Sequence, residues 1–242
     1  MRILLHLSFL GSNYHGFQKQ KNALTIQNVL ENKLFILHQE KTNIVGCSRT
    51  DTGVNAESFY CHFDIKENTI NYKRALNSLL PNDIYVIDYQ KVSNDFHARF
   101  SCLNKIYVYR FQTEYDLFKK DFTYFYCQFL DIQKMEECCT YLKGTHNFYA
   151  FTTNDEKESY LRTIFEVYLI REGTEIIFSI KGDGFLRYMV RTLSSALLNV
   201  GKGKLSVTEF LTFLDQENKK YKERLPGYAL TLKEVNYENI SH

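Results

Sequence analysis

Tryptophan is absent from the 242-residue sequence, which also has only 2 prolines and 11 glycines. Collagen-like, mucin-like and generally disordered chains have much more proline or glycine, so these classes are excluded. Apolar runs such as residues 3–5 and 196–198 are far shorter than the roughly 20 residues that cross a bilayer. The sequence therefore predicts no transmembrane helix, and a length of one large domain or two small ones.

No long apolar stretch precedes the polar residues Gly11, Ser12 and Asn13, so a secretory signal is not expected and the predicted location is cytoplasmic. The six cysteines form no C-x-x-C pair. The adjacent Cys138 and Cys139 fall in a helical pattern, where a disulfide between them would be strained. We interpret all six as buried, reduced thiols, and predict no metal site because the seven histidines do not cluster with them.

Neither sign of charge predominates. Thirty basic and 28 acidic residues give a formal net charge of +2 and a pI near 8.1. Dedicated nucleic-acid-binding domains often exceed a pI of about 9, so this balance says little about partners. A basic face requires that the charges segregate on the surface.

The hydrophobic pattern divides the chain into two similar halves. In the first half, Thr25 is expected to cap a helix with one apolar face, and Pro81 to follow the end of a second helix. The apolar face consists of Ile26, Val29, Leu30, Leu34 and Leu37. The pattern predicts the order βαββαβ, with strands at residues 3–9, 43–48, 58–65 and 84–92, and the second helix at about residues 71–80.

The second half repeats this order with one additional helix. Asp131 is expected to cap its first helix and Gly144 to end it, while Ser206 and Glu209 form a capping box at the additional helix. The predicted elements are strands at residues 105–113, 163–171, 175–182 and 230–237, a first helix after Asp131, and a later helix at residues 185–200.

Two such units in tandem predict an α+β protein of two ferredoxin-like (βαββαβ) units. Each unit would have a sheet rich in antiparallel pairs with its helices on one side, and the free faces would form a central cleft. The predicted domains are residues 1–104 and 105–242.

The loop at residues 46–56 is the most unusual stretch of the chain, because Arg49 and Asp51 lie between two predicted buried strands. One interpretation is structural: Asp51 makes a local turn and Arg49 a surface ion pair, as turn chemistry explains most Asp-x-Gly segments. The other is functional, because a carboxylate between buried strands is costly unless it is paired or used.

Residues 49–56, Arg-Thr-Asp-Thr-Gly-Val-Asn-Ala, resemble the R-T-D-A-G-V-H-A loop of the TruA-type tRNA pseudouridine synthases. Four further segments are similar to motifs of that family, in the same order along the whole chain. They are residues 14–20 (Y-x-G-[WF]-Q-x-Q), 96–100 (F-H-A-R-F), 105–109 (the strand with the active-site tyrosine) and 185–191 (F-L-x-x-M-V-R).

The resemblance implies a role for particular residues. Asp51 is the nucleophile, Tyr107 stacks on the target uracil, and Arg191 is the active-site arginine that pairs with the carboxylate. Arg49 enters the RNA stem to hold the flipped nucleotide out, Leu230 forms an apolar floor, and Arg187 contacts RNA. From the residues alone the alternatives are a core tyrosine at 107, a core leucine at 230, and helix charges at 187 and 191, which are four residues apart on a predicted helix.

The sequence departs from the family pattern at a few positions. Thr52 replaces the usual alanine, Asn55 the usual histidine, and Arg187 and Tyr188 a pair that is often His-His. Residues 229–232, Ala-Leu-Thr-Leu, stand where the family has G-L-Y-L. None of these changes removes the presumed nucleophile.

The leading hypothesis is a cytoplasmic isomerase that converts uridine to pseudouridine in the anticodon stem-loop of tRNA. This rearrangement exchanges no electrons and releases no group, so no cofactor or metal is expected, and no Walker or Rossmann motif is present. The resemblance implies a homodimer. One rival is a non-catalytic RNA-binding protein of two RRM-like units, but neither half has the typical RNP strand. Another is an Asp-dependent hydrolase, for which no paired acid stands out.

Overall fold

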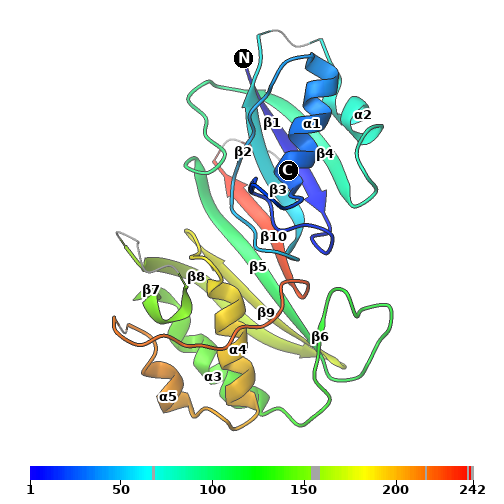
Figure 1. Ribbon diagram of the computed structural model, residues 1–242. Helices are drawn as coiled ribbons and strands as arrows, with labels where there is room; N and C mark the ends of the chain where they lie inside the picture. The colour runs from blue at the N-terminus through cyan, green and yellow to red at the C-terminus, as the bar shows by residue number, and fades with distance from the viewer. Residues whose placement is uncertain (67–68, 154–158, 216, 239, 241–242) are drawn as a thin grey trace. The chain divides into compact units, whose positions relative to one another are not determined.

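The computed structural model describes residues 1–66, 69–153, 159–215, 217–238 and 240 (Figure 1). Its internal contacts divide the chain into two units. Unit 1 comprises Met1–Leu103 and Leu232–His242, and unit 2 comprises Asn104–Thr231. The C-terminal residues thus group with the first part of the chain, although the sequence pattern counts them with the second half.

Unit 1 is built on an antiparallel sheet in which β1 lies between β3 and β4. The short β2 pairs with β3, and β10 follows β3 in the sheet order, which explains why the C-terminal residues belong to this unit. Its elements are β1 (Arg2–Phe9), α1 (Ile26–His38), β2 (Val45–Gly46), β3 (Asn55–Asp64), α2 (Tyr72–Asn77), β4 (Ile84–Val92) and β10 (Leu230–Tyr237).

The first helix forms as its sequence predicts. Thr25 adopts an extended backbone, and its side chain accepts a hydrogen bond from the Asn28 N–H, which satisfies one free donor at the helix start. Ile26, Leu30 and Leu34 are fully buried, so the centre of the predicted apolar face packs in the core. Val29 and Leu37, also predicted on this face, are only half-buried.

Two elements of unit 1 are shorter than predicted. The strand expected at residues 43–48 is only β2, because the Ile44 N–H donates to the carboxylate of Glu31 on α1 instead of to a neighbouring strand. The helix expected to reach residue 80 ends at Asn77, whose side chain exchanges two hydrogen bonds with the backbone of Val86 on β4. The Leu80 N–H still donates to the Leu76 carbonyl over 2.8 Å, so the chain makes one further turn before Pro81. A side-chain hydrogen bond replaces regular backbone pairing only at Ile44.

Within unit 2 the strands follow the order β5-β9-β8-β7, all antiparallel, and β6 pairs with β5 in parallel. The helix α3 contacts β8, α4 and α5. The elements are β5 (Cys102–Gln112), β6 (Tyr124–Phe125), α3 (Ile132–Leu142), β7 (Gly144–Asn147), a 3-10 helix (Tyr149–Phe151), β8 (Leu161–Glu172), β9 (Glu175–Gly182), α4 (Met189–Gly201) and α5 (Val207–Leu211).

The sequence pattern did not predict β6, β7 or the 3-10 helix, which are too short to show a periodicity. The expected helix start at residue 185 is also wrong: α4 begins at Met189 because Tyr188 adopts a left-handed backbone with φ of 63°. Residues 185–187 therefore lie outside the helix.

The coarse prediction of an α+β protein with antiparallel-rich sheets is confirmed. In the part of the chain that the structure describes, no helix is long and apolar enough to cross a membrane. All six cysteines are free, but the prediction that all are buried is wrong, since Cys127 is exposed and Cys102 is half-buried.

Candidate active site

The loop that carries Asp51 contains a tight turn. The Val54 N–H donates to the Asp51 carbonyl over 3.2 Å, which closes a four-residue β-turn. Gly53 is the third residue of this turn and has a φ of 78°. A positive φ at that position is the mark of a type II turn and favours glycine, so the Asp-x-Gly spacing has a direct structural reason.

The segment at residues 11–17 packs against the backbone of this loop. The Gly53 N–H donates to the Tyr14 carbonyl over 3.3 Å, and the Phe17 N–H donates to the Thr50 carbonyl over 3.4 Å. Gly16 approaches so closely that an added Cβ would lie 2.2 Å from the Thr50 carbonyl oxygen. Residues 11–17, which are far from Asp51 in sequence, therefore fix the backbone on both sides of it.

Two side chains complete this support. Asn55, which stands where the family has histidine, is buried, and its side-chain oxygen accepts the Gly11 N–H over 2.8 Å. Tyr14 donates its hydroxyl to Asp83 over 2.6 Å. Burial, with the neighbouring Asp83 carboxylate, holds the pKa of Tyr14 well above its usual value, so its proton stays in this bond. Both residues support the structure of the loop, and Asn55 does so although its position departs from the family pattern.

Asp51 is half-buried, whereas Arg49 two residues earlier is exposed. Among the residues that the structure describes, Arg49 makes no ion pair, so the surface ion pair of the structural interpretation is not formed. The side chain is available to a ligand.

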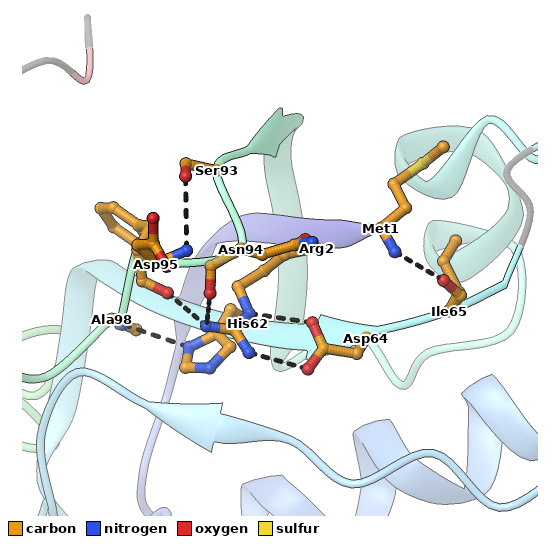
Figure 2. A network of polar contacts seen from close by, with 10 residues as sticks. Met1, Arg2, His62, Asp64, Ile65, Ser93, Asn94, Asp95 and Ala98 are labelled. Carbon is orange, nitrogen blue, oxygen red and sulfur yellow. Dashed lines mark hydrogen bonds and ion pairs between the residues drawn. The ribbon is translucent and has the colours of Figure 1, made fainter.

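The F-H-A-R-F segment is anchored by a polar network on β1 and β3 (Figure 2). The Arg2 guanidinium donates to the carbonyls of Asn94 and Phe96 over 2.7 and 2.6 Å, and also pairs with the Asp64 carboxylate. The Ala98 N–H donates to Nδ1 of His62 over 3.1 Å. Burial lowers the pKa of His62 to about 4, so its ring is neutral near pH 7 and can accept this bond.

In unit 2, Tyr107 lies on β5, where it is paired with Ile180 of β9 and almost completely buried. The ring of Phe185 meets it edge to face, with 5.0 Å between centroids. Phe185 belongs to the same motif as Arg191, so the tyrosine strand and the arginine motif are in contact.

Arg191 is held in the first turn of α4 by the segment that leads to β10. Its Nε donates to the Leu225 carbonyl over 2.8 Å, while the Tyr109 hydroxyl donates to the next carbonyl, that of Pro226, over 3.1 Å. Leu230, the first residue of β10, is buried, and its N–H donates to Gly227 over 2.9 Å. The predicted arginine and the predicted apolar floor are therefore linked within one unit.

The expectation that Arg187 and Arg191 share a helix face is wrong, because Arg187 precedes the helix. The two guanidinium groups instead meet at the ring of Tyr188, with their carbons 4.9 and 5.2 Å from its centroid. Arg187 is exposed and donates to the Tyr188 hydroxyl over 3.1 Å. Tyr188 is a residue that the sequence analysis noted only as a departure from the family pattern.

The candidate residues fall into two groups. Asp51 and Arg49 belong to unit 1, and Tyr107, Arg187 and Arg191 belong to unit 2 together with Leu230. That Asp51 faces Arg191 and Tyr107 stays a prediction. Within the described ranges, no group of three or more His, Cys, Asp or Glu side chains could hold a metal ion.

Comparison with known proteins gives consistent matches. A family model described as tRNA pseudouridine synthase matches residues 138–238. The chain is 37% identical over 98% of its length to tRNA pseudouridine synthase A of Oceanobacillus iheyensis, and covers 97% of that protein. The protein of the same name from Clostridium acetobutylicum is 35% identical, with 97% and 99% of the two chains covered, and that from Clostridium kluyveri is 38% identical, with 97% and 99% covered.

A solved structure, described as a crystal structure of a Cbf5-Nop10-Gar1 complex, matches 81% of this chain and 45% of that chain. The sequence identity is 11% and the TM-score is 0.36. The fold described above depends on its own strand pairing and not on this likeness.

Proposed function

Because the chain belongs to the tRNA pseudouridine synthase A family, we propose that it converts uridine to pseudouridine in the anticodon stem-loop of tRNA, with Asp51 as the nucleophile. The observation that carries the proposal is the near full-length similarity to the synthase of Oceanobacillus iheyensis. A non-catalytic RNA-binding protein and a hydrolase are disfavoured by the same observation.

The reaction is a rearrangement within one nucleotide. The bond between N1 of uracil and C1′ of ribose breaks, the uracil turns while bound, and C5 bonds to C1′. The proton on C5 leaves and N1 gains one, so atoms and electrons balance without a cofactor. The protein must therefore hold a detached base, provide a nucleophile and remove one proton.

A carboxylate at position 51 suits this chemistry because it can bond to the nucleotide and leave again. The proposed partner is the Arg191 guanidinium, which would keep the carboxylate charged and oriented. The turn at Gly53 and the packing of residues 11–17 support this role, because they hold the Asp51 backbone in place before substrate binds.

The remaining candidates act on the flipped nucleotide. Tyr107 would stack on the uracil and assist removal of the C5 proton, and the buried Leu230 would support the base from below. Arg49 would occupy the space that the base leaves in the RNA stem, as its exposed side chain permits. Flipping costs a few kcal/mol, which contacts between basic side chains and phosphates can offset.

The proposal includes an architecture and a setting. The strand order β4-β1-β3 with β2 beside β3 supports a ferredoxin-like unit 1, and we infer a second such unit and a cleft that brings Asp51 to Arg191 and Tyr107. The enzyme would act in the cytoplasm on tRNA, as a homodimer.

The function is tested with an unmodified tRNA transcript that carries tritium at C5 of uracil. The purified protein is expected to release tritium, and mapping of the product is expected to place pseudouridine in the anticodon stem-loop. Pseudouridine at another site would overturn the position but not the reaction. Tight binding of the transcript without any release would favour the RNA-binding rival.

A further inference from the structure

Tyr188 is surrounded by three arginine side chains. The guanidinium carbons of Arg187, Arg191 and Arg224 lie 4.9, 5.2 and 3.9 Å from the centroid of its ring. Each pair of guanidinium groups is therefore about 10 Å or less apart, within roughly one Debye length at 0.1 M salt, so they repel each other. Cation–π contacts with one ring can offset this repulsion, but they do not neutralise the positive charge of the guanidinium groups.

The acidic residues nearest in sequence do not supply the missing negative charge. The Glu223 carboxylate accepts a hydrogen bond from Asn199, and Asp183 accepts the backbone N–H of Thr163. In the described part of the chain, neither Arg187 nor Arg224 forms an ion pair. Arg187 and Arg224, held beside one ring without a carboxylate, therefore favour an anion from outside the protein.

The backbone holds this cluster in place at some cost. Tyr188 has a φ of 63°, a conformation that costs a bulky residue about 1–2 kcal/mol. Its carbonyl accepts hydrogen bonds from the backbone N–H and the hydroxyl of Thr192, and the Thr152 hydroxyl donates to the carbonyl of Arg187. The strained residue is thus fixed from two sides, as is common where a side chain must be presented to a ligand.

We propose that the ring of Tyr188 stacks with Arg187 and Arg224 and holds them together as a binding site for a phosphodiester of the RNA. This site would lie beside the nucleotide that reacts. Arg191 touches the same ring, which places the phosphate next to the proposed active-site arginine. Planar guanidinium groups match the geometry of phosphate oxygens, and stacking on an aromatic face keeps them oriented. The inference rests on the proposed function, because the ligand is the backbone of the substrate RNA.

The test measures the affinity for an unmodified tRNA transcript over a series of salt concentrations, together with kcat and KM for tritium release. Arg224→Gln is expected to weaken binding roughly tenfold and to reduce the slope of log affinity against log salt by about 0.7–0.9, the value for one lost phosphate contact. KM should rise much more than kcat falls. Arg171→Gln removes an equal charge from the end of β8 and should leave the affinity within about twofold.

The role of the ring is tested separately. Tyr188→Leu keeps a bulky residue at the same backbone position but removes the stacking surface, so it should reproduce the loss of affinity and of salt slope. Tyr188→Phe keeps the ring and should bind almost as the wild type does. Tyr168→Leu, on an exposed tyrosine of β8, is the matched control. Thermal unfolding identifies any variant that fails to fold.

The phosphate site and the proposed function are tested independently of each other. If the wild-type protein forms pseudouridine but Arg224→Gln and Tyr188→Leu bind RNA with unchanged affinity and slope, the phosphate site is wrong and the proposed function stands. A slope lost equally in the Arg171 control also overturns the site. If the wild type binds tRNA but releases no tritium, the proposed function is wrong, and the binding data still decide the phosphate site.

Discussion

Gly16 packs directly against the backbone of the loop that carries Asp51. Gly16→Ala would place a Cβ 2.2 Å from the Thr50 carbonyl oxygen, at a φ of 84°. We expect a loss of roughly 2–4 kcal/mol in the free energy of unfolding, from backbone strain and from the clash. Because Thr50 precedes Asp51, kcat for pseudouridine formation should also fall. Urea unfolding and the tritium-release assay measure the two effects.

Gly203→Ala is the matched control for this prediction. Gly203 has a similar φ of 69°, but nothing lies within 4 Å of the position of its Cβ. Its substitution should cost about 1–2 kcal/mol from strain alone and leave kcat unchanged. Equal losses in the two variants would show that the close contact with Thr50 has no separate effect.

At the scale of single residues, the motif residues could be found in the sequence but their partners could not. Gly11 and Tyr14 form hydrogen bonds with residues of the Asp51 loop that lie about 40 positions later in the sequence. Tyr14 also bonds to Asp83, which is still further along the chain. Periodicity carries no information about such pairs. The turn at Gly53, by contrast, is local and follows from the Asp-x-Gly spacing.

Among the elements, the start of β1, the end of β3 and the connection after β4 are joined by Arg2 and His62 (Figure 2). Burial and the nearby Arg2 lower the pKa of His62 to about 4, below the 6.5 of a free histidine. Between these values the unfolded chain binds a proton that the folded chain does not. Stability should therefore fall as the pH is lowered from about 6.5 to 4, by at most about 3 kcal/mol from this residue.

His62→Asn tests this pH dependence, because asparagine keeps an acceptor for the Ala98 N–H but does not titrate. The free energy of unfolding of the variant should change less than that of the wild type between pH 6.5 and 4. His97 packs against His62 and its pKa is also lowered, so a part of the dependence will remain. His15→Asn, at an exposed histidine, is the control. An unchanged pH dependence in His62→Asn would contradict the assignment.

Helices and strands were predicted correctly where the hydrophobic pattern repeats regularly over many residues. The predictions failed where a single residue interrupts that pattern. The bounds of β4 and β10 agree with the sequence pattern, as do α1 and α3 with their caps. The start of α4 does not, because the left-handed backbone of Tyr188 ends the regular pattern of residues 185–191. That irregular residue is the one that gathers the arginines.

For the whole molecule, the proposed homodimer can be tested by its mass. Light scattering on the purified protein should give twice the chain mass of 28.6 kDa at micromolar concentration. Addition of tRNA should raise this mass without separating the subunits. A mass of one chain at all concentrations, with full activity, would contradict the dimer.

The sequence pattern shows that the two halves repeat the same order of elements. It does not show that most of β10 groups with unit 1. Tyr237 donates its hydroxyl to the Ala98 carbonyl, and Lys233 pairs with Glu57, so β10 is tied to unit 1 by contacts with distant residues. The proposed site draws its carboxylate from unit 1 and its arginine and tyrosine from unit 2.

The central claim is that the carboxylate of Asp51 performs the reaction. The most direct measurement is the single-turnover rate of tritium release from tRNA by Asp51→Asn, compared with the wild type and with Asp88→Asn, which alters an exposed aspartate on β4. We expect a loss of roughly 10⁴-fold or more for Asp51→Asn, with tRNA affinity retained and the Asp88 variant unaffected. A rate for Asp51→Asn within tenfold of the wild type would contradict it.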